Sequence, residues 1–223
     1  MSSYVVFDIE SGPRPLEEIQ KLLGPFDPVS KLGPKPGEFD PSTVKIGNLK
    51  DQAKIDEKIE SARVAWNQAR DAYDSELANC EQRYWSEVMD RAALDATLGE
   101  VLAIGYRTDK KTVIHHADEM DEAGMLRYFW EQFEKLRRAS RNLVGHYSNS
   151  FDVQFIARRS WLIGVQVPSF ALSAAGWLDQ TFVDIMARWQ FGNKRDSIKL
   201  DTVARALGHA GKPEGMDGSM FHE

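Results

Sequence analysis

Apolar and charged side chains alternate along residues 4–13, which read Tyr-Val-Val-Phe-Asp-Ile-Glu-Ser-Gly-Pro. This period of two predicts a β-strand with Phe7 and Ile9 on its buried face and Asp8 and Glu10 together on the other. Two like charges side by side are costly to bury unless a cation holds them, and magnesium or manganese ions take carboxylate oxygens as ligands. The alternation therefore predicts a divalent metal site on the first strand.

The apolar residues that follow this strand have a different spacing. Residues 24–47 are rich in proline and glycine and predict a loop, whereas residues 48–98 contain neither. Within 48–98, apolar positions recur about every 3.7 residues, close to an eleven-residue repeat, which predicts a long amphipathic helix with a nearly straight packing seam. From residue 51 to 91 it would extend roughly 60 Å. Two arrangements remain open, an antiparallel hairpin or a projecting arm with a partner, so a homo-oligomer through residues 51–91 is expected. The stripe consists of Ile55, Ile59, Ala62, Trp66, Ala69, Tyr73, Leu77, Cys80, Tyr84 and Val88.

The rest of the chain mixes both periods, which predicts an α/β fold. Strands are expected at 101–106, 112–116 and 142–144, and helices at about 126–136, 151–163 and 197–207, with another helix opening at Asp184. Ser148 or Ser150 is expected to cap the 151–163 helix, and Leu162 and Ile163 to help bury it. We therefore expect one core of residues 1–29 and 97–223, and an insertion of residues 30–96.

The charge and residue composition of the chain exclude some classes of function. The net charge of −6 argues against binding nucleic acid through overall positive charge, but basic residues gather in 135–159 and 186–212, as a polyanionic substrate would require. There is no apolar run of membrane-spanning length and no signal-peptide pattern, so we expect a soluble, cytoplasmic protein with no membrane partner. Cys80 is the single cysteine, which excludes an internal disulfide and a cysteine-based zinc cluster.

A second marker lies at Gly145-His146-Tyr-Ser-Asn149-Ser-Phe151-Asp152, where an aspartate stands at the head of a helix. Together with the Asp-x-Glu strand, it resembles the DEDD (DnaQ-like) 3′-to-5′ exonucleases, which have an RNase H-like fold: a mixed sheet flanked by helices, here with a long helical insertion after the first strand. The tail at 197–208 and 211–218 looks like the bacterial and phage branch related to the proofreading domain of family B DNA polymerases. The resemblance covers 4–13 and about 100–220.

The resemblance implies roles for particular residues. Asp8 would bridge two Mg²⁺ or Mn²⁺ ions, Glu10 would ligate the ion that activates the attacking water, and Asp152 would hold the second ion. The reaction would be phosphodiester hydrolysis at a DNA 3′ end, single-stranded by expectation, with RNA left open as a substrate. The remaining residues expected to contact nucleic acid are His146, Asn149, Phe151, Arg158 and Lys199.

The family's last motif places a tyrosine or histidine and a fourth carboxylate on a further helix, and the chain ends at Glu223 before it. Two expectations follow, a truncated form of a longer enzyme or a naturally shortened and impaired one. His116 and Asp121 match the spacing of that motif by chance, because they precede Asp152. The alternative function is an inactive module that binds nucleic acid or assembles through the long helix.

Overall fold

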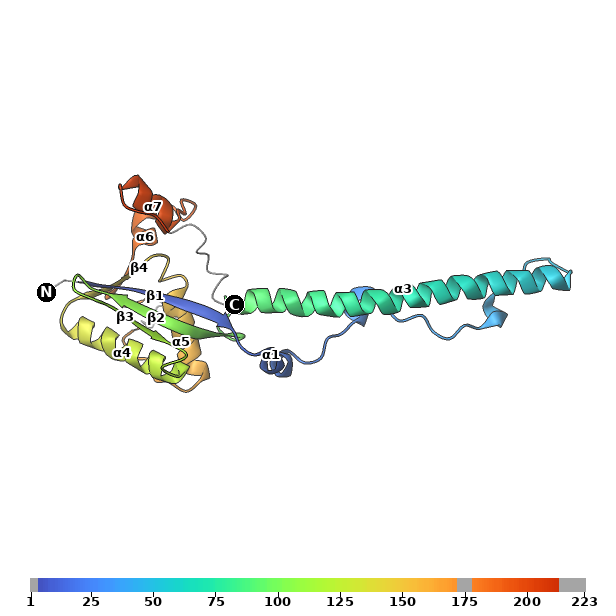
Figure 1. Cartoon of the computed structure of the whole chain (residues 1–223), viewed down its shortest axis with the longest axis horizontal. Helices are drawn as coiled ribbons and strands as arrows, with labels where there is room; N and C mark the ends of the chain where they lie inside the picture. The colour runs from blue at the N-terminus through green and yellow to red at the C-terminus, as the bar shows by residue number, and fades with distance from the viewer. Residues whose placement is uncertain (1–3, 172–177, 213–223) are drawn as a thin grey trace. The chain divides into compact units, whose positions relative to one another are not determined.

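The computed structural model describes residues 4–171 and 178–212 of the 223-residue chain (Figure 1). The chain divides into two compact units, one of residues 1–15 and 91–223 and one of residues 16–90. The limits expected for the inserted domain, residues 30 and 96, stay a prediction. Residues 213–218 of the tail motif, Asp217 included, lie outside the described residues.

The first unit is built on a five-stranded mixed sheet with the strand order β3-β2-β1-β4-β5. β1 pairs antiparallel with β2 and parallel with β4, β2 pairs antiparallel with β3, and β4 pairs parallel with β5. The predicted α/β fold is thus confirmed. The strands are β1 (Tyr4–Pro13), β2 (Gly99–Arg107), β3 (Thr112–His116), β4 (Asn142–Gly145) and β5 (Phe182–Asp184).

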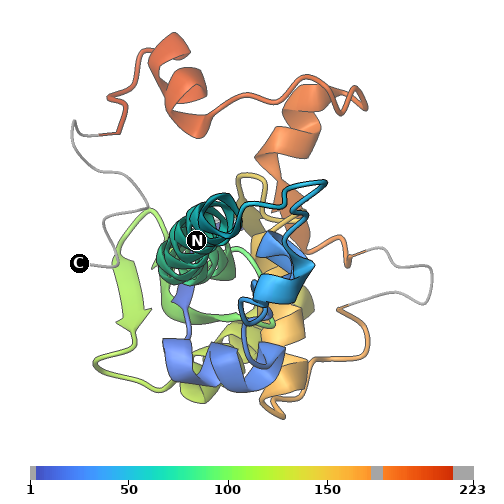
Figure 2. The same ribbon diagram turned by 90° about the vertical axis from the view of Figure 1, so that its right-hand side faces the viewer.

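Helices flank this sheet. α4 (Glu122–Arg138) and α5 (Asp152–Leu162) cover one face, whereas α6 (Ile185–Gln190) and α7 (Leu200–Ala206) lie away from α4, beyond the end of β5 (Figures 1 and 2). The core between the sheet and α4 is aromatic, since the Phe133 and Phe182 rings stack 4.6 Å apart. The helix predicted at 197–207 begins three residues later, at Leu200.

β1 alternates as the sequence predicts. Phe7 and Ile9 are buried in the core, whereas Asp8 is exposed and Glu10 half-buried. The ladder with β2 shifts register just after Glu10, because Glu10 pairs with Ala103 and Ser11 with Val101. Such an irregularity re-aims the strand next to the paired carboxylates.

The second unit contains the long helix predicted from the apolar stripe. α3 (Gln52–Ala92) is one unbroken helix of 41 residues, so the predicted hairpin is wrong. The preceding proline- and glycine-rich segment runs antiparallel along it within residues 16–90. Contacts join the Phe26 and Tyr84 rings (5.2 Å), the Gly33 carbonyl and Tyr73 hydroxyl (3.2 Å), and the Phe39 and Trp66 rings (6.1 Å). The shorter elements of this unit are α1 (Leu16–Leu23), α2 (Val29–Leu32) and the 3₁₀ helix η1 (Pro41–Thr43).

These contacts explain why the apolar stripe of α3 is partly buried. Except for Ala69, the predicted stripe positions within α3 are half-buried, although the neighbouring positions are mostly exposed. An extended segment without hydrogen-bond periodicity can cover an apolar seam through a few large side chains, and proline disfavours helix there. Self-association through residues 51–91 stays a proposal.

Two details of the 151–163 helix differ from expectation. Leu162 and Ile163 are exposed, because they lie where α5 ends, beyond the buried Arg159 and Ser160. Its N-cap is Phe151, which makes no side-chain cap hydrogen bond, and the Val153 amide bonds the carbonyl oxygen of Ser148 instead of its hydroxyl. In the part of the chain that the structure describes, no helix combines the length and apolar character needed to cross a membrane.

Candidate active site

Three carboxylates predicted to act together come from two elements. Asp8 and Glu10 project from the same face of β1, and Asp152 is the first residue of α5. The Asp152 carboxylate accepts a hydrogen bond from the Ile9 amide at 3.3 Å, which ties the helix start to the strand between the two acids. Asp152 is only 5% exposed. The sheet and α5 therefore bring one buried and two more accessible carboxylates to the same region.

The electrostatics of these acids are unfavourable without a cation. Burial, followed by the charge of Asp8, raises the pKa of Asp152 to about 7. Protein atoms around the Asp8 carboxyl group raise its pKa even though the residue is exposed, and the Ile9 amide, Lys212 and His146 offset part of that rise. Burial and then Asp8 raise the pKa of Glu10, which Lys212 also partly offsets. Asp8 is thus the member that repels both other acids.

Such a donor set suits a hard divalent cation. Carboxylate oxygens are its preferred ligands, and a cation would relieve the repulsion that Asp8 exerts on Glu10 and Asp152. Among residues 4–171 and 178–212, however, no three aspartate, glutamate, histidine or cysteine side chains lie close enough together to hold a metal ion as they stand. The three carboxylates are suitable metal ligands and lie near enough to repel one another, but they are further apart than the ligands of a bound metal ion.

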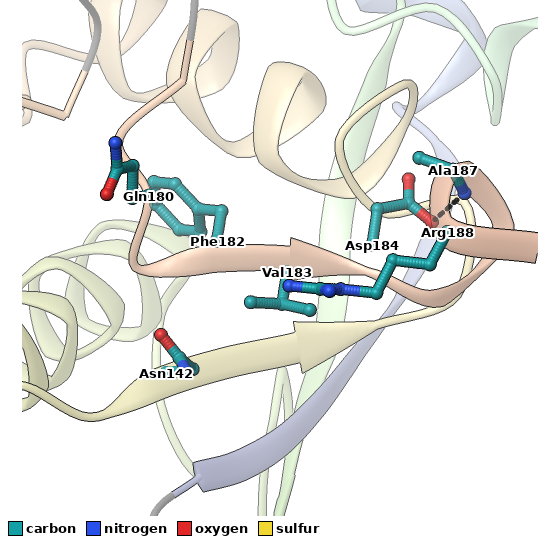
Figure 3. Close-up of a pocket in the computed structure, with 7 residues that line it drawn as sticks. All are labelled: Asn142, Gln180, Phe182, Val183, Asp184, Ala187 and Arg188. Atoms are coloured by element: carbon teal, nitrogen blue, oxygen red, sulfur yellow. Dashed lines mark hydrogen bonds between the residues drawn. The ribbon is translucent and has the colours of Figure 1, made fainter. Parts of the chain in front are cut away.

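The loop after β4 is held beside these acids by a fourth carboxylate, Asp184. Its side chain accepts hydrogen bonds from the amides of Tyr147 (2.9 Å) and Asn149 (3.0 Å), and also caps α6 through the Met186 and Ala187 amides. Figure 3 shows Asp184 at the end of β5, with its carboxylate directed at Ala187. The predicted helix start at Asp184 is confirmed, and its acceptor capacity is largely used by backbone amides.

Gly145 lets this loop turn tightly. A Cβ atom there would lie 2.5 Å from the Cβ of Ser148, closer than real side chains approach, so a larger residue would push the loop away. Three buried polar atoms of the loop have no hydrogen-bond partner within the described residues: Nδ1 of His146, Oγ of Ser148 and Oδ1 of Asn149. Buried polar atoms are normally paired, so these atoms are candidates for contact with a ligand or water.

A groove opens from Asp8 toward α7. It is a pocket of about 710 Å³ lined by Asp8, Lys199, Asp201, Lys212 and neighbouring residues of the α7 region. The Asp201 carboxylate accepts hydrogen bonds from Arg205 (3.0 Å) and from the backbone amide of Lys212, which shapes the turn after α7. These interactions lower the pKa of Asp201, the Lys212 amide having the larger effect.

This groove is lined by one predicted residue and by one that was not singled out, and a second predicted residue lies beside it. Lys199 lines it as expected, and His146 reaches the adjoining segment through a 3.0 Å contact between its Nε2 and the Ile198 carbonyl. Lys212 was not singled out, although it lies near enough to affect the pKa of both Asp8 and Glu10. It follows Gly211 in a turn that has no periodic signal, and only the fold of that turn brings it to the acids.

The other predicted nucleic-acid contacts are placed less directly. Phe151 is half-buried and packs against Phe155 with ring centroids 5.5 Å apart, so part of its surface already serves the core. Asn149 is half-buried, and its backbone carbonyl accepts a hydrogen bond from Gln154 (2.9 Å). Arg158 is exposed and donates to Gln154 (3.0 Å) from further along α5. All three stay proposals as substrate contacts.

Some basic residues of the 135–159 stretch serve the fold. Arg159 is 3% exposed and forms a paired salt bridge with Glu122, with N–O distances of 2.8 and 2.6 Å. It also donates to the Ala96 carbonyl at 3.1 Å. Arg137 pairs with Asp179 at 3.1 Å. These two arginines therefore contribute less to a substrate surface than the sequence count indicates.

The chance match of the last motif is explained by local structure. Asp121 is the N-cap of α4 and accepts from the Gly124 amide at 2.8 Å. His116 ends β3 and faces two exposed acids, Asp118 and Glu119, at 3.4 and 3.3 Å. Both residues thus have local structural partners.

A comparison with known protein families agrees with the fold. A family model described as the RNase_H superfamily matches residues 89–223, more than half of the chain, so the chain belongs to the RNase H superfamily. The RNase H-like fold that the resemblance implied is thereby confirmed. The matched residues include Asp152 but not β1. No curated protein matches the sequence.

Among solved structures, the chain is similar to the family B DNA polymerase of the hyperthermophilic archaeon Pyrobaculum calidifontis, with 21% sequence identity and a TM-score of 0.40. The match covers 56% of this chain and 17% of the polymerase chain.

Proposed function

We propose that this protein is a metal-dependent 3′-to-5′ exonuclease that hydrolyses phosphodiester bonds at single-stranded DNA 3′ ends. The observation that carries the proposal is the meeting of Asp8, Glu10 and Asp152 beside a groove lined by Lys199 and Lys212. Acids that repel one another favour cations, and lysines next to them favour a polyanion. Membership of the RNase H superfamily supports the same reaction class.

The three carboxylates would hold Mg²⁺ or Mn²⁺. When bound, two such ions supply charge stabilisation at the attacking and leaving oxygens of an in-line displacement. Asp8 is the acid whose charge raises the pKa of both Glu10 and Asp152, so all three would hold the ions together.

The chain's own residues would position the substrate. Lys199 and Lys212 can each contact a backbone phosphate from the wall of the groove. The unpartnered atoms of His146 and Asn149 can bind the terminal nucleotide, and the open part of Phe151 can stack on its base. Arg158, which is exposed on α5, would contact the DNA strand. RNA remains a second substrate, because no residue is assigned to a 2′-hydroxyl.

The test is digestion of a single-stranded DNA oligonucleotide labelled at its 5′ end, in Mn²⁺, by the parent protein and Asp8→Ala. We expect stepwise shortening from the 3′ end by the parent and a loss of about a hundredfold or more in Asp8→Ala, because a shared metal ligand is removed. Glu131→Ala removes an exposed acid of α4, the helix that packs on the opposite face of the sheet through Phe7 and Phe129, and serves as the matched control. Equal rates for parent and Asp8→Ala would reject the assignment.

A second candidate is a module that binds nucleic acid or assembles through α3 and has no nuclease activity. The open arrangement of the three acids and the half-buried stripe of α3 favour it. A DNA-binding module would bind DNA without cleaving it in Mg²⁺ or Mn²⁺. An assembly module would form an oligomer whose size, measured by light scattering, depends on concentration, and replacing residues 42–96 with a short linker would abolish that oligomer. Cleavage that depends on Asp8 decides for the enzyme.

A further inference from the structure

A second pocket lies on the α4 side of the sheet, away from the three carboxylates. It has a volume of about 350 Å³ and is lined by residues of β1, β2, β3 and α4 and of the turns beside them. Val5, which lines it, is on the face of β1 that also carries Phe7 and Ile9, opposite to Asp8. The pocket is therefore separate from the candidate active site.

The charges that line this pocket have one sign. Lys111, Lys135 and Arg141 are lining residues, and none of the described lining residues is acidic. Lys135 is 3.8 Å from the exposed Glu131, a long ion pair on the surface of α4. Three cations gathered around a pocket without a lining carboxylate favour an anionic ligand.

The inner wall is aromatic and has unpaired polar atoms. Tyr106 is 7% exposed, and neither its hydroxyl nor the buried Nε of Arg141 has a hydrogen-bond partner within the described residues. Tyr106 and Tyr128 meet edge to face at 5.6 Å, beside the apolar side chains of Val5 and Val113. A planar ring fits such a wall, and a buried hydroxyl without a partner is a candidate for contact with a ligand or water.

We propose that this pocket binds a small anion that carries one phosphate group and one planar ring, of the nucleoside monophosphate class. The phosphate lies among Lys111, Lys135 and Arg141, and the ring lies against Tyr106 and Tyr128. The pocket volume falls in the range of small-molecule sites, about 300–1,000 Å³. The inference stands apart from the proposed nuclease, because its residues and its test involve neither the metal nor the three acids.

The experiment titrates the full chain, in EDTA, with dAMP, deoxyadenosine or inorganic phosphate, and follows the methyl NMR signals of Val5 and Val113. We expect dAMP to shift these signals at lower concentration than either fragment. Replacing Lys111 and Lys135 together with glutamine should weaken dAMP binding about tenfold or more. Lys110→Gln is the matched control, because Lys110 is an exposed neighbour in the same turn that does not line the pocket.

Tyr106→Phe provides a second measurement. Losing an unpaired hydroxyl should leave the melting temperature of the ligand-free protein unchanged or higher, while dAMP binding weakens several-fold. Phosphate alone binding as tightly as dAMP would overturn the assignment of the ring. No shift of the Val5 and Val113 signals at about 10 mM dAMP, or equal binding by the Lys111 and Lys135 double variant, would overturn the site.

Discussion

Replacing Asp152 with asparagine keeps the shape of the side chain but removes its ionisable group. The asparagine carbonyl can still accept the 3.3 Å hydrogen bond from the Ile9 amide, so the link between α5 and β1 is retained. What changes is the cost of holding a buried charge next to Asp8. We expect Asp152→Asn to be more stable than the parent at high pH when no metal is present.

The magnitude follows from the pKa. The ordinary value of 3.8 rises to about 7 in the folded protein, so the folded state binds the proton more tightly than the unfolded state. The contribution of this group to stability is fully present below the unfolded pKa and is lost as the pH rises from there through about 7. The full loss is about 4 kcal/mol at roughly 1.36 kcal/mol per pKa unit, of which about 3 kcal/mol falls between about pH 5 and pH 8.

The assay is urea unfolding of both proteins in EDTA at about pH 5 and pH 8, then at about pH 8 with Mn²⁺. The parent should lose stability from the lower to the higher pH relative to Asp152→Asn, and Mn²⁺ should restore much more of the stability of the parent than of the variant. Parallel pH profiles for the two proteins in EDTA would refute the argument that Asp152 is held at a raised pKa. An equal response to Mn²⁺ would refute its role as a metal ligand.

Three further predictions concern other parts of the chain. Arg159→Met should lower the free energy of unfolding by about 3 kcal/mol, since it removes the ion-pair partner of the half-buried Glu122 carboxylate, which keeps only the hydrogen bond from the Val101 amide. Arg158→Met at an exposed position should change the free energy of unfolding by less than about 0.5 kcal/mol, and similar losses in urea would contradict this. Phe39→Ala and Trp66→Ala should show a coupling energy of about 0.5–1.5 kcal/mol in a double-mutant cycle, and additive effects would mean that the segment does not pack on α3 in solution. Lys199→Gln should weaken single-stranded DNA binding and flatten its salt dependence by about one ion, and an unchanged slope would remove Lys199 from the groove.

The strand bearing Asp8 and Glu10 was predictable because side-chain alternation depends only on backbone geometry. The helix start at Asp184 was also predictable, since an aspartate there accepts the free amides of the first turn. The three-residue strand β5 was not expected, because so short a segment has no measurable period.

Contacts between distant segments were the part that the sequence did not reveal. The covering of Trp66 by Phe39 depends on an extended segment whose path is set by packing, and such a segment has no repeating pattern. Lys212 reaches the acids only because Asp201 fixes the turn after α7. Charge counts also misled for Arg159, because sequence alone does not distinguish a solvated arginine from one buried against a carboxylate.

The inserted segment leaves and re-enters the sheet at one point. Pro13 pairs with Gly99 across β1 and β2, and the Arg14 amide donates to the Leu98 carbonyl at 3.0 Å. The two ends of the insertion are thus as close as the ends of an ordinary hairpin turn, which is where chains best tolerate exchange of one inserted domain for another. A fluorescent reporter with adjacent termini, substituted for residues 16–90, would give a fusion that keeps the pairing of Pro13 with Gly99 and the Ala96 carbonyl to which Arg159 donates.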